Sequence, residues 1–376
     1  MGTHRRTVGR ALSESHVKAG LHIGQLLQPV PGGIGRYVVH LAQNLAAADV
    51  EVVCFGAGTP TPRVQTLVGD SINLGWPRGP LRYELWHRAR RPRLHLPVDV
   101  VHAPSLAVPP TGSVPLAVTV HDVAFLREPD AFTKRGLSFH KRGLDLAHRH
   151  ANVIITASRF ARNELVSIGF DRAHIFLAPH GVALRAPEPD SVIDGRVEKT
   201  GMRAPFVLAV GTVEPRKGLD TLAKALAVAR RDVPELSAAI VGPDGWLTVS
   251  GLEEPGIHRL GTVDERTLDA LYRRALVCAV PSRYEGFGLP ALEAMARGCP
   301  VAASNATSLP EVVGAAGLLV PVNAVDAWAA AFVDLASDPE RCADLARRGR
   351  ERAAGFTWRG SAHAHAAAYA AAVEGP

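Results

Sequence analysis

Short apolar runs alternate with helix-like segments along most of this chain, and this alternation limits the possible folds more than any other feature. Runs rich in Val, Ile, Leu and Ala that are separated by helical patterns are typical of a parallel sheet with helices on both faces. In the second half the predicted strands are 205–211, 236–242, 276–282, 300–304 and 317–321. The predicted helices between them are 218–232, 264–275, 290–298, 309–314 and 326–338.

The first half follows the same pattern, with predicted strands at 20–29, 50–56, 98–104, 115–122, 152–158 and 174–179 and helices at 35–48, 134–150 and 158–167. A chain of 376 residues normally divides into two domains. We therefore predict an α/β protein of two facing, Rossmann-like, doubly wound parallel-sheet domains. Ligands of such sheets bind beyond the carboxyl ends of the strands, so the active site is expected in the cleft between the domains.

The polar segment 183–202 separates the halves and is the best candidate for a linker. The predicted organisation is a disordered leader at 1–20, an N-terminal domain at 21–185 and a linker at 186–203. A C-terminal domain at 204–356 follows, and a last helix at 357–376 crosses back to the first domain.

The leader is basic but lacks the apolar core of a signal peptide. No run of about 18 apolar residues predicts a membrane span. Four cysteines without CxxC spacing fit reduced thiols, so we predict a cytoplasmic protein.

The net charge of +6 is unevenly distributed. Residues 1–190 contain 22 Lys and Arg against 14 Asp and Glu, a balance of +8, whereas residues 191–376 contain 20 against 22, a balance of −2. A basic first half can attract nucleic acid, an anionic membrane surface or an acidic acceptor. The arginines can equally be solvated surface residues, and both explanations stay open.

The stretch SRYEGFGLPALEAMARGCPV, residues 282–301, contains the most specific pattern. Pro290 suits the first turn of a helix and Gly298 the position just after its end. Glu285 is then expected in a loop and Glu293 in the helix, with a glycine turn at the helix N-terminus. Free backbone N–H groups and partial positive charge at such a terminus suit an anion. Two carboxylates beside an anion site indicate a ligand that also carries hydroxyls, such as a sugar nucleotide.

A glycine loop, PGGIGRYV at 31–38, follows the first predicted strand. It is close to a dinucleotide fingerprint but lacks the third glycine, and the second strand ends in FGAG rather than an acidic residue. An NAD site is therefore poorly supported. Gly32 and Gly33 allow the backbone to approach a phosphate, because neither carries a Cβ; a simple tight turn is the alternative.

Two further sets of residues stand at predicted strand ends. VGTVEPRKGLD, residues 210–220, places Gly211, Arg216 and Lys217 before a helix, where the two cations can neutralise a diphosphate leaving group. A solvated loop pair is the alternative. His121 ends the strand VTVHD and faces the expected cleft, either as a catalytic residue or as a structural histidine. The sequence contains no HExxH, zinc-like cysteine set, Asp-x-Asp pair or GxSxG motif.

Together, PGGIGRYV, GTVEPRKG, LGTVDERTLDALYRRA, PSRYEGFGLPALEAMARGCPV and FTWRG resemble the retaining GT-B glycosyltransferases of family four. The resemblance runs from about residue 21 to 370 and is greatest to bacterial mannosyltransferase-like members. It implies a GT-B fold and a nucleoside diphosphate sugar as donor substrate, with no cofactor and no bound metal.

The resemblance also implies roles for individual residues. Glu285 would hold donor-sugar hydroxyls and Glu293 the ribose hydroxyls, while Arg216 and Lys217 would hold the diphosphate that Gly33 covers. His121 would lie near the donor sugar. The backbone around the glycine turn and the loop beside the base complete the expected donor site: Gly286, Phe287, Gly288, Leu289 and Leu260 to Val263.

Two departures from the family pattern are visible. Many relatives end the first domain with Pro-Asn-Gly-Val-Asp, whereas this chain has His180 and Ala183 at the Asn and Asp positions, so the roles of that Asn and Asp do not carry over. The segment 76–97 is rich in arginine and aromatic residues. It either contacts a lipid-linked or anionic acceptor or forms a solvated amphipathic helix.

The resulting expectation is a hexosyltransferase that retains configuration, with GDP-mannose as the first choice of donor and UDP-glucose or UDP-N-acetylglucosamine as alternatives. Expected partners are the nucleotide sugar and a glycan, lipid-linked or small-molecule acceptor, with peripheral contact to the inner membrane face possible and nucleic acid excluded. A sugar-nucleotide epimerase or a phosphorylase of the same architecture and a non-catalytic glycan- or anion-binding protein are the remaining alternatives. The combination of Arg216, Lys217, Glu285 and Glu293 argues against a simple binder.

Overall fold

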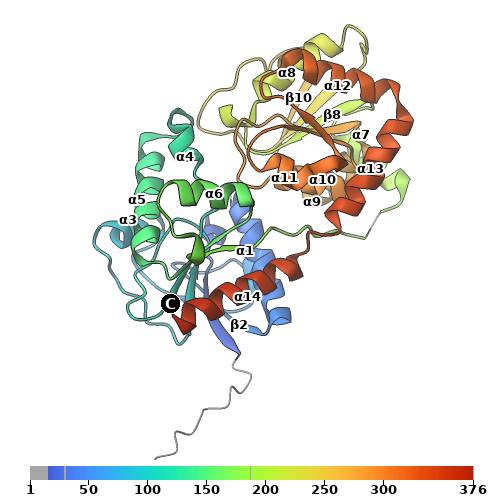
Figure 1. Ribbon diagram of the computed structural model, residues 1–376. Helices are drawn as coiled ribbons and strands as arrows, with labels where there is room; N and C mark the ends of the chain where they lie inside the picture. The colour runs from blue at the N-terminus through green and yellow to red at the C-terminus, as the bar shows by residue number, and fades with distance from the viewer. Residues whose placement is uncertain (1–15, 29–30, 187, 376) are drawn as a thin grey trace, which may run out of the picture.

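The computed structural model describes residues 16–28, 31–186 and 188–375. Two parallel sheets form two domains that face each other (Figure 1). The first sheet has seven strands in the order β3-β2-β1-β4-β5-β6-β7. Their bounds are Val17–His22 (β1), Val50–Gly56 (β2), Ser71–Asn73 (β3), Val100–Ala103 (β4), Leu116–Thr119 (β5), Val153–Thr156 (β6) and Ile175–Leu177 (β7).

The second sheet has six strands in the order β10-β9-β8-β11-β12-β13. Their bounds are Phe206–Val210 (β8), Ser237–Val241 (β9), Ile257–Gly261 (β10), Val277–Val280 (β11), Val301–Ser304 (β12) and Leu318–Val320 (β13). Every strand pair in both sheets is parallel. The prediction of two doubly wound parallel-sheet domains is therefore confirmed.

Helices cover both faces of each sheet, so each domain contains two apolar layers. The helices of the first domain are α1 (Gly32–Asn44), α2 (Pro62–Val68), α3 (Gly79–Arg88), α4 (Ala124–Arg127), α5 (Lys134–His150) and α6 (Arg159–Ser167). Those of the second are α7 (Asp190–Lys199), α8 (Leu219–Ala229), α9 (Glu265–Arg274), α10 (Leu289–Ala296), α11 (Leu309–Val313), α12 (Val325–Ser337) and α13 (Pro339–Ala353). The helix α3 buries one side, with Arg82, Trp86 and His87 inside, whereas Leu81 on its other side is 49% exposed.

The last helix, α14 (Trp358–Glu374), crosses back and packs on the first sheet, as the red helix beside the blue strands in Figure 1 shows. Its Tyr369 hydroxyl lies 2.8 Å from Nδ1 of His102, and His365 Nε2 lies 2.6 Å from the hydroxyl of Tyr37 on α1. These buried polar contacts fix the crossing helix to the first domain, since buried polar groups need partners.

Two predicted boundaries are wrong. The strand β1 begins at Val17, so the end of the predicted leader belongs to the first sheet; residues 1–15 of that leader lie outside the described residues. The predicted linker 186–203 contains the helix α7, which belongs to the second domain. Ile193 and Val197, spaced four residues apart, bury one apolar stripe of this helix in the second core. The polar residues around them conceal that stripe in the sequence.

The two domains also contact each other directly beside the cleft. Ser158 Oγ, at the N-cap of α6, donates to the carbonyl of Gly286 at 2.6 Å. The backbone N–H groups of Arg159 and Phe160 donate to the carboxylate of Glu311 on α11 at 2.8–3.3 Å. This carboxylate lies at the N-terminus of α6, where the helix dipole favours negative charge. These contacts fix the distance between the two walls of the cleft.

Candidate functional site

A cleft of about 1680 Å³ lies between the carboxyl ends of the two sheets. Residues that follow strands of both domains line it, as expected for doubly wound sheets. Most of the predicted site residues lie on its walls: Gly32, Gly33, His121, Gly211, Arg216, Lys217, Val263, Glu285, Gly286, Phe287, Gly288 and Leu289. The structure therefore brings together residues that are far apart in the sequence.

Two predicted donor-site residues do not line the cleft. Leu260 lies in β10 and packs against the core of the second domain. The neighbouring residues Thr262 and Val263 line the cleft instead, because the strand has ended and the chain turns toward it. The prediction for Leu260 is corrected accordingly. Glu293 lies behind the wall and is covered by Arg36, which does line the cleft.

A buried charge cluster stands at the end of β8. Lys217 Nζ lies 2.6 Å from Oε1 of Glu285, and Arg216 Nη1 lies 3.8 Å from its Oε2. Ser282 Oγ donates to the same carboxylate at 2.8 Å. Arg216 also donates from Nε to Glu214 at 2.8 Å. Two cations and two carboxylates are thus held in one network, and three-quarters or more of each side chain is buried.

The side chains of this cluster stay ionised although they are buried, because each charge has an opposite charge beside it. Burial alone raises the pKa of Glu285, but Lys217 and Arg216 outweigh it and hold that pKa below the usual value. Burial lowers the pKa of Arg216, and the carboxylates of Glu285 and Glu214 reverse this, so its pKa is raised. Glu285 is therefore a carboxylate at neutral pH, able to accept hydrogen bonds from hydroxyls, and the Arg216 guanidinium stays charged.

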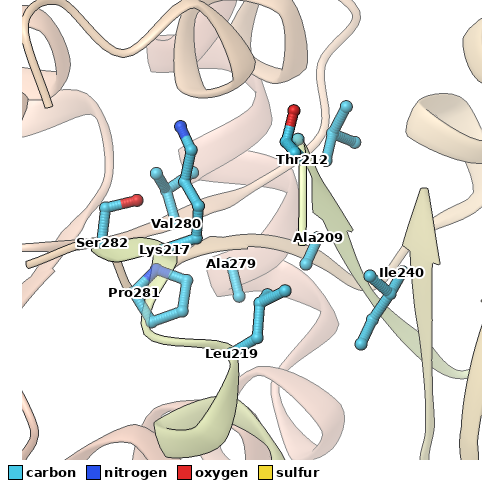
Figure 2. Close-up of a pocket in the computed structure, with 11 residues that line it drawn as sticks. Ala209, Thr212, Lys217, Leu219, Ile240, Ala279, Val280, Pro281 and Ser282 are labelled. Atoms are coloured by element: carbon cyan, nitrogen blue, oxygen red, sulfur yellow. The ribbon is translucent and has the colours of Figure 1, made fainter. Parts of the chain in front are cut away.

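Figure 2 shows the side chain of Lys217 above a small cavity with apolar residues at its floor. The cavity has a volume of about 10 Å³ and is enclosed by Leu219, Ile240 and Ala279 together with other residues of the strand ends. The amino group of Lys217 points away from this apolar floor (Figure 2). An ammonium carries three N–H donors, and Glu285 takes only one of them. The others are available to an anion in the cleft.

The glycine turn at 286–288 adds backbone donors. Gly288 has a φ of +104° and is the N-cap of α10, a left-handed conformation that favours glycine. The backbone N–H groups of Phe287 and Gly288 make no hydrogen bond to any other described residue. Both residues line the cleft at a helix N-terminus, so their N–H groups can donate to an anion or to a sugar oxygen. At the other end of α10, Gly298 has a φ of +73°, as the sequence predicts for a residue just after the helix.

His121 lies on the opposite wall, two residues after the end of β5. Its Nε2 is 3.0 Å from the carbonyl oxygen of Pro104, which can only accept, so Nε2 carries the proton. Burial lowers the pKa of His121 below the usual value, and the ring is neutral near pH 7. The second nitrogen, Nδ1, is then an acceptor for a hydroxyl. The ring packs edge-on against Tyr37 at a centroid distance of 5.0 Å, which fixes its orientation.

His180, at the position where many relatives have Asn, lies on the cleft wall next to this histidine. Its ring centroid is 5.5 Å from that of His121 and 5.0 Å from that of Phe287. Burial lowers the pKa of His180 well below the usual value, so it is uncharged at neutral pH. His180 therefore contributes an aromatic surface between the two domains, a contribution that an asparagine would not make.

Four contributing residues were not identified from the sequence. Glu214 and Ser282 orient Arg216 and Glu285, while Tyr272 and Arg36 hold Glu293 through bonds of 3.0 and 2.7 Å. Glu214 and Ser282 carry a local signal, since they precede Arg216 and Glu285 by two and three residues. Tyr272 and Arg36 reach Glu293 from 21 and 257 residues away, and no spacing in the chain indicates them.

The described residues contain no group of three or more His, Cys, Asp or Glu side chains placed to hold a metal ion. Among the same residues, no helix has the length and apolar character that crossing a membrane requires. Metal independence and the cellular location remain predictions.

Comparison with known proteins agrees with this arrangement. Residues 31–185 match the family described as Glycosyltransferase Family 4, and residues 195–352 match the family described as Glycosyl transferases group 1. The chain is 30% identical to O-antigen chain mannosyltransferase B of Escherichia coli, over 87% of this chain and 92% of that protein. It is also 30% identical to the D-inositol 3-phosphate glycosyltransferase of Kineococcus radiotolerans, over 94% of each.

Solved structures share the fold. Sucrose-phosphate synthase from Thermosynechococcus elongatus superposes with a TM-score of 0.70 at 24% identity, covering 92% of this chain and 96% of that one. Anabaena HepE in complex with UDP-glucose superposes with a TM-score of 0.72 at 19% identity, covering 94% and 98%. At these identities the similarity extends to the fold alone.

Proposed function

The chain belongs to the family 4 glycosyltransferases, and from this premise we propose that it moves a hexosyl group from a nucleoside diphosphate sugar to an acceptor hydroxyl with retention of configuration. The observation that carries the proposal is the cluster of Arg216, Lys217 and Glu285 beside the free backbone N–H groups of the glycine turn. Cations and N–H groups suit a diphosphate, and a buried ionised carboxylate suits sugar hydroxyls.

The proposed mechanism is a displacement on one face of the sugar. The bond between the anomeric carbon and the diphosphate oxygen breaks, and the acceptor oxygen bonds to the same face of that carbon. The acceptor proton moves to the departing diphosphate oxygen. Arg216 and Lys217 stabilise the charge that develops on the leaving group, while Glu285 and the neutral His121 hold sugar hydroxyls. No metal takes part in this proposal, because the two cations provide the positive charge.

We propose GDP-mannose as the donor, since a relative of 30% identity is named a mannosyltransferase. UDP-sugars are the alternative, because one structural neighbour contains UDP-glucose. The names of the relatives suggest two kinds of acceptor, a growing glycan and a sugar-like phosphate.

Thermal unfolding with GDP, UDP, ADP and NAD, each with and without magnesium, tests the donor proposal. A ligand at 100 times its dissociation constant adds about 2.7 kcal/mol to the stability of the native state. We expect selective stabilisation by GDP that does not depend on magnesium and is lost in Glu293→Ala. Stabilisation by UDP alone would mean that the donor carries uracil rather than guanine as its base. No shift with any nucleoside diphosphate would contradict the proposed function.

We further propose that the first domain contacts an anionic membrane surface next to the cleft. Trp76 and Leu81 are 79% and 49% exposed, and Arg78 between them lines the cleft. Arg78 is exposed and forms no ion pair with any other described residue. Exposed aromatic and aliphatic groups beside an unpaired arginine fit an anionic lipid interface, where each cation contributes about 1 kcal/mol.

Sedimentation with lipid vesicles tests this contact. We expect binding to vesicles that contain phosphatidylglycerol, weakening as salt is added, and no binding to pure phosphatidylcholine. The double variant Trp76→Ser, Leu81→Ser should bind less, whereas Val373→Ser, another exposed apolar residue at 44%, should bind like the wild type. Equal binding to both lipids, or none to either, would contradict the proposal.

A further inference from the structure

An ion pair between the two domains covers the carboxylate to which the ribose is assigned. Arg36 lies on α1 of the first domain, and its Nη1 is 2.7 Å from Oε1 of Glu293 on α10 of the second. The Tyr272 hydroxyl donates to the other carboxylate oxygen at 3.0 Å. A carboxylate accepts about four hydrogen bonds, so Glu293 can keep both partners and still accept from ribose hydroxyls.

Arg36 retains hydrogen-bonding capacity toward the cleft. A guanidinium has five N–H donors, and only one of those on Arg36 bonds to another described residue. The Arg36 side chain is 42% exposed, against 14% for Glu293, and it lines the cleft. A cation with unused donors at this place suits an anionic ligand.

The position of Arg36 along α1 indicates which part of the ligand it meets. Arg36 follows Gly33 by one helical turn, a rise of about 5 Å, so both residues face the same side. The space around Gly33 is open, since a Cβ added there would have no neighbour within 4 Å. Arg36 thus stands between the open backbone near Gly33, where the diphosphate is expected, and the carboxylate that takes the ribose.

We infer that Arg36 is a donor-binding residue of the first domain that bridges Glu293 and the phosphate groups of the nucleotide. The planar guanidinium donates a hydrogen bond to the carboxylate from one side and a second one to a phosphate oxygen from the other. The nucleotide then contacts both domains, and its binding favours the closed cleft. This inference rests on the proposed function, because it assigns a further contact in the same donor site.

Calorimetric titration of the wild type, Arg36→Ala and Arg36→Lys with GDP, UDP, guanosine and uridine tests the inference. For the diphosphate that the wild type binds, Arg36→Ala should lose about 10- to 100-fold in affinity, the range for one charged hydrogen bond. Affinity for the matching nucleoside should change little, because it has no phosphate. Arg36→Lys should have an intermediate affinity for the diphosphate, since lysine keeps the charge but lacks the planar guanidinium that can bond to two partners at once. Arg149→Ala, which removes an ion pair within α5, is the matched control and should bind normally.

The outcomes separate the inference from the proposed function. If Arg36→Ala loses equal affinity for the diphosphate and for the nucleoside, Arg36 acts only by holding Glu293, and the inference is overturned. Unchanged or tighter diphosphate binding in Arg36→Ala would overturn it as well, because the ion pair would then be neutral or compete with the ligand. A wild type that binds no nucleoside diphosphate would overturn the proposed function together with the inference.

Discussion

Lys217→Ala should lower turnover about 10²- to 10³-fold, the usual effect of losing one preorganised group that stabilises charge in the transition state. Lys217 is the closest cation to Glu285, at 2.6 Å, and it lines the cleft in which we propose that the leaving group departs. Arg216 remains in this variant but lies at 3.8 Å from the carboxylate. Steady-state rates with saturating donor measure the effect.

The same substitution should also lower the stability of the folded protein, so its effect on stability and its effect on turnover are measured separately. Removing one partner of a buried ion pair lowers the free energy of unfolding by about 3–5 kcal/mol when the other charge is left without a partner. Ser282 and Arg216 still contact Glu285, so the loss should be smaller than that. Adding Glu285→Gln to Lys217→Ala removes the buried charge and should restore much of the stability but none of the turnover. Thermal unfolding distinguishes the two.

Lys224→Ala is the matched control, since Lys224 is an exposed lysine on the neighbouring helix α8. It should retain both the rate and the stability of the wild type. Near-normal turnover in a folded Lys217→Ala protein would contradict the role assigned to Lys217 and weaken the proposed mechanism.

The sequence predicts the architecture well because most strands are short apolar runs that are buried on both faces of the sheet; only the edge strands β3 and β10 are largely exposed. The spacing of Glu285 and Glu293 likewise places a glycine turn at a helix start, since Pro290 and Gly298 mark the two ends of α10 locally. The carboxyl ends of the strands then bring His121, Lys217 and Glu285 to one cleft. These features depend on local sequence and general rules of topology.

Features that depend on contacts between distant residues could not be predicted. Arg36 and Glu293 are 257 residues apart, and nothing in either segment indicates their ion pair. The strand β10 was missed because its residues IHRLG are partly polar, as suits an edge strand with one neighbour. The resemblance assigns Leu260 to the cleft, whereas on this strand it is partly buried and packs against the core of the second domain.

Gly286→Ala should lower turnover by about 100-fold while both domains remain folded. The chain at Gly286 passes directly against the first domain: an added Cβ would lie 2.4 Å from the carbonyl oxygen of His121 and 2.8 Å from Cβ of Asp122. Real Cβ atoms do not approach backbone so closely, so the two walls of the cleft must move apart. A displacement of about 1 Å between reacting groups typically costs about 10²-fold in rate. The glycine therefore sets the distance between His121 and Glu285.

Gly195→Ala is the matched control for this last substitution, because a Cβ at Gly195 on α7 would have no neighbour within 4 Å. It should leave turnover unchanged and raise stability slightly, by up to about 1 kcal/mol, as alanine does in a helix. In Gly286→Ala, steady-state rates should fall while thermal unfolding changes little, and small-angle scattering should report a larger radius of gyration. Wild-type turnover in Gly286→Ala would mean that the two walls can separate without consequence, and that the cleft closes by another contact during the reaction.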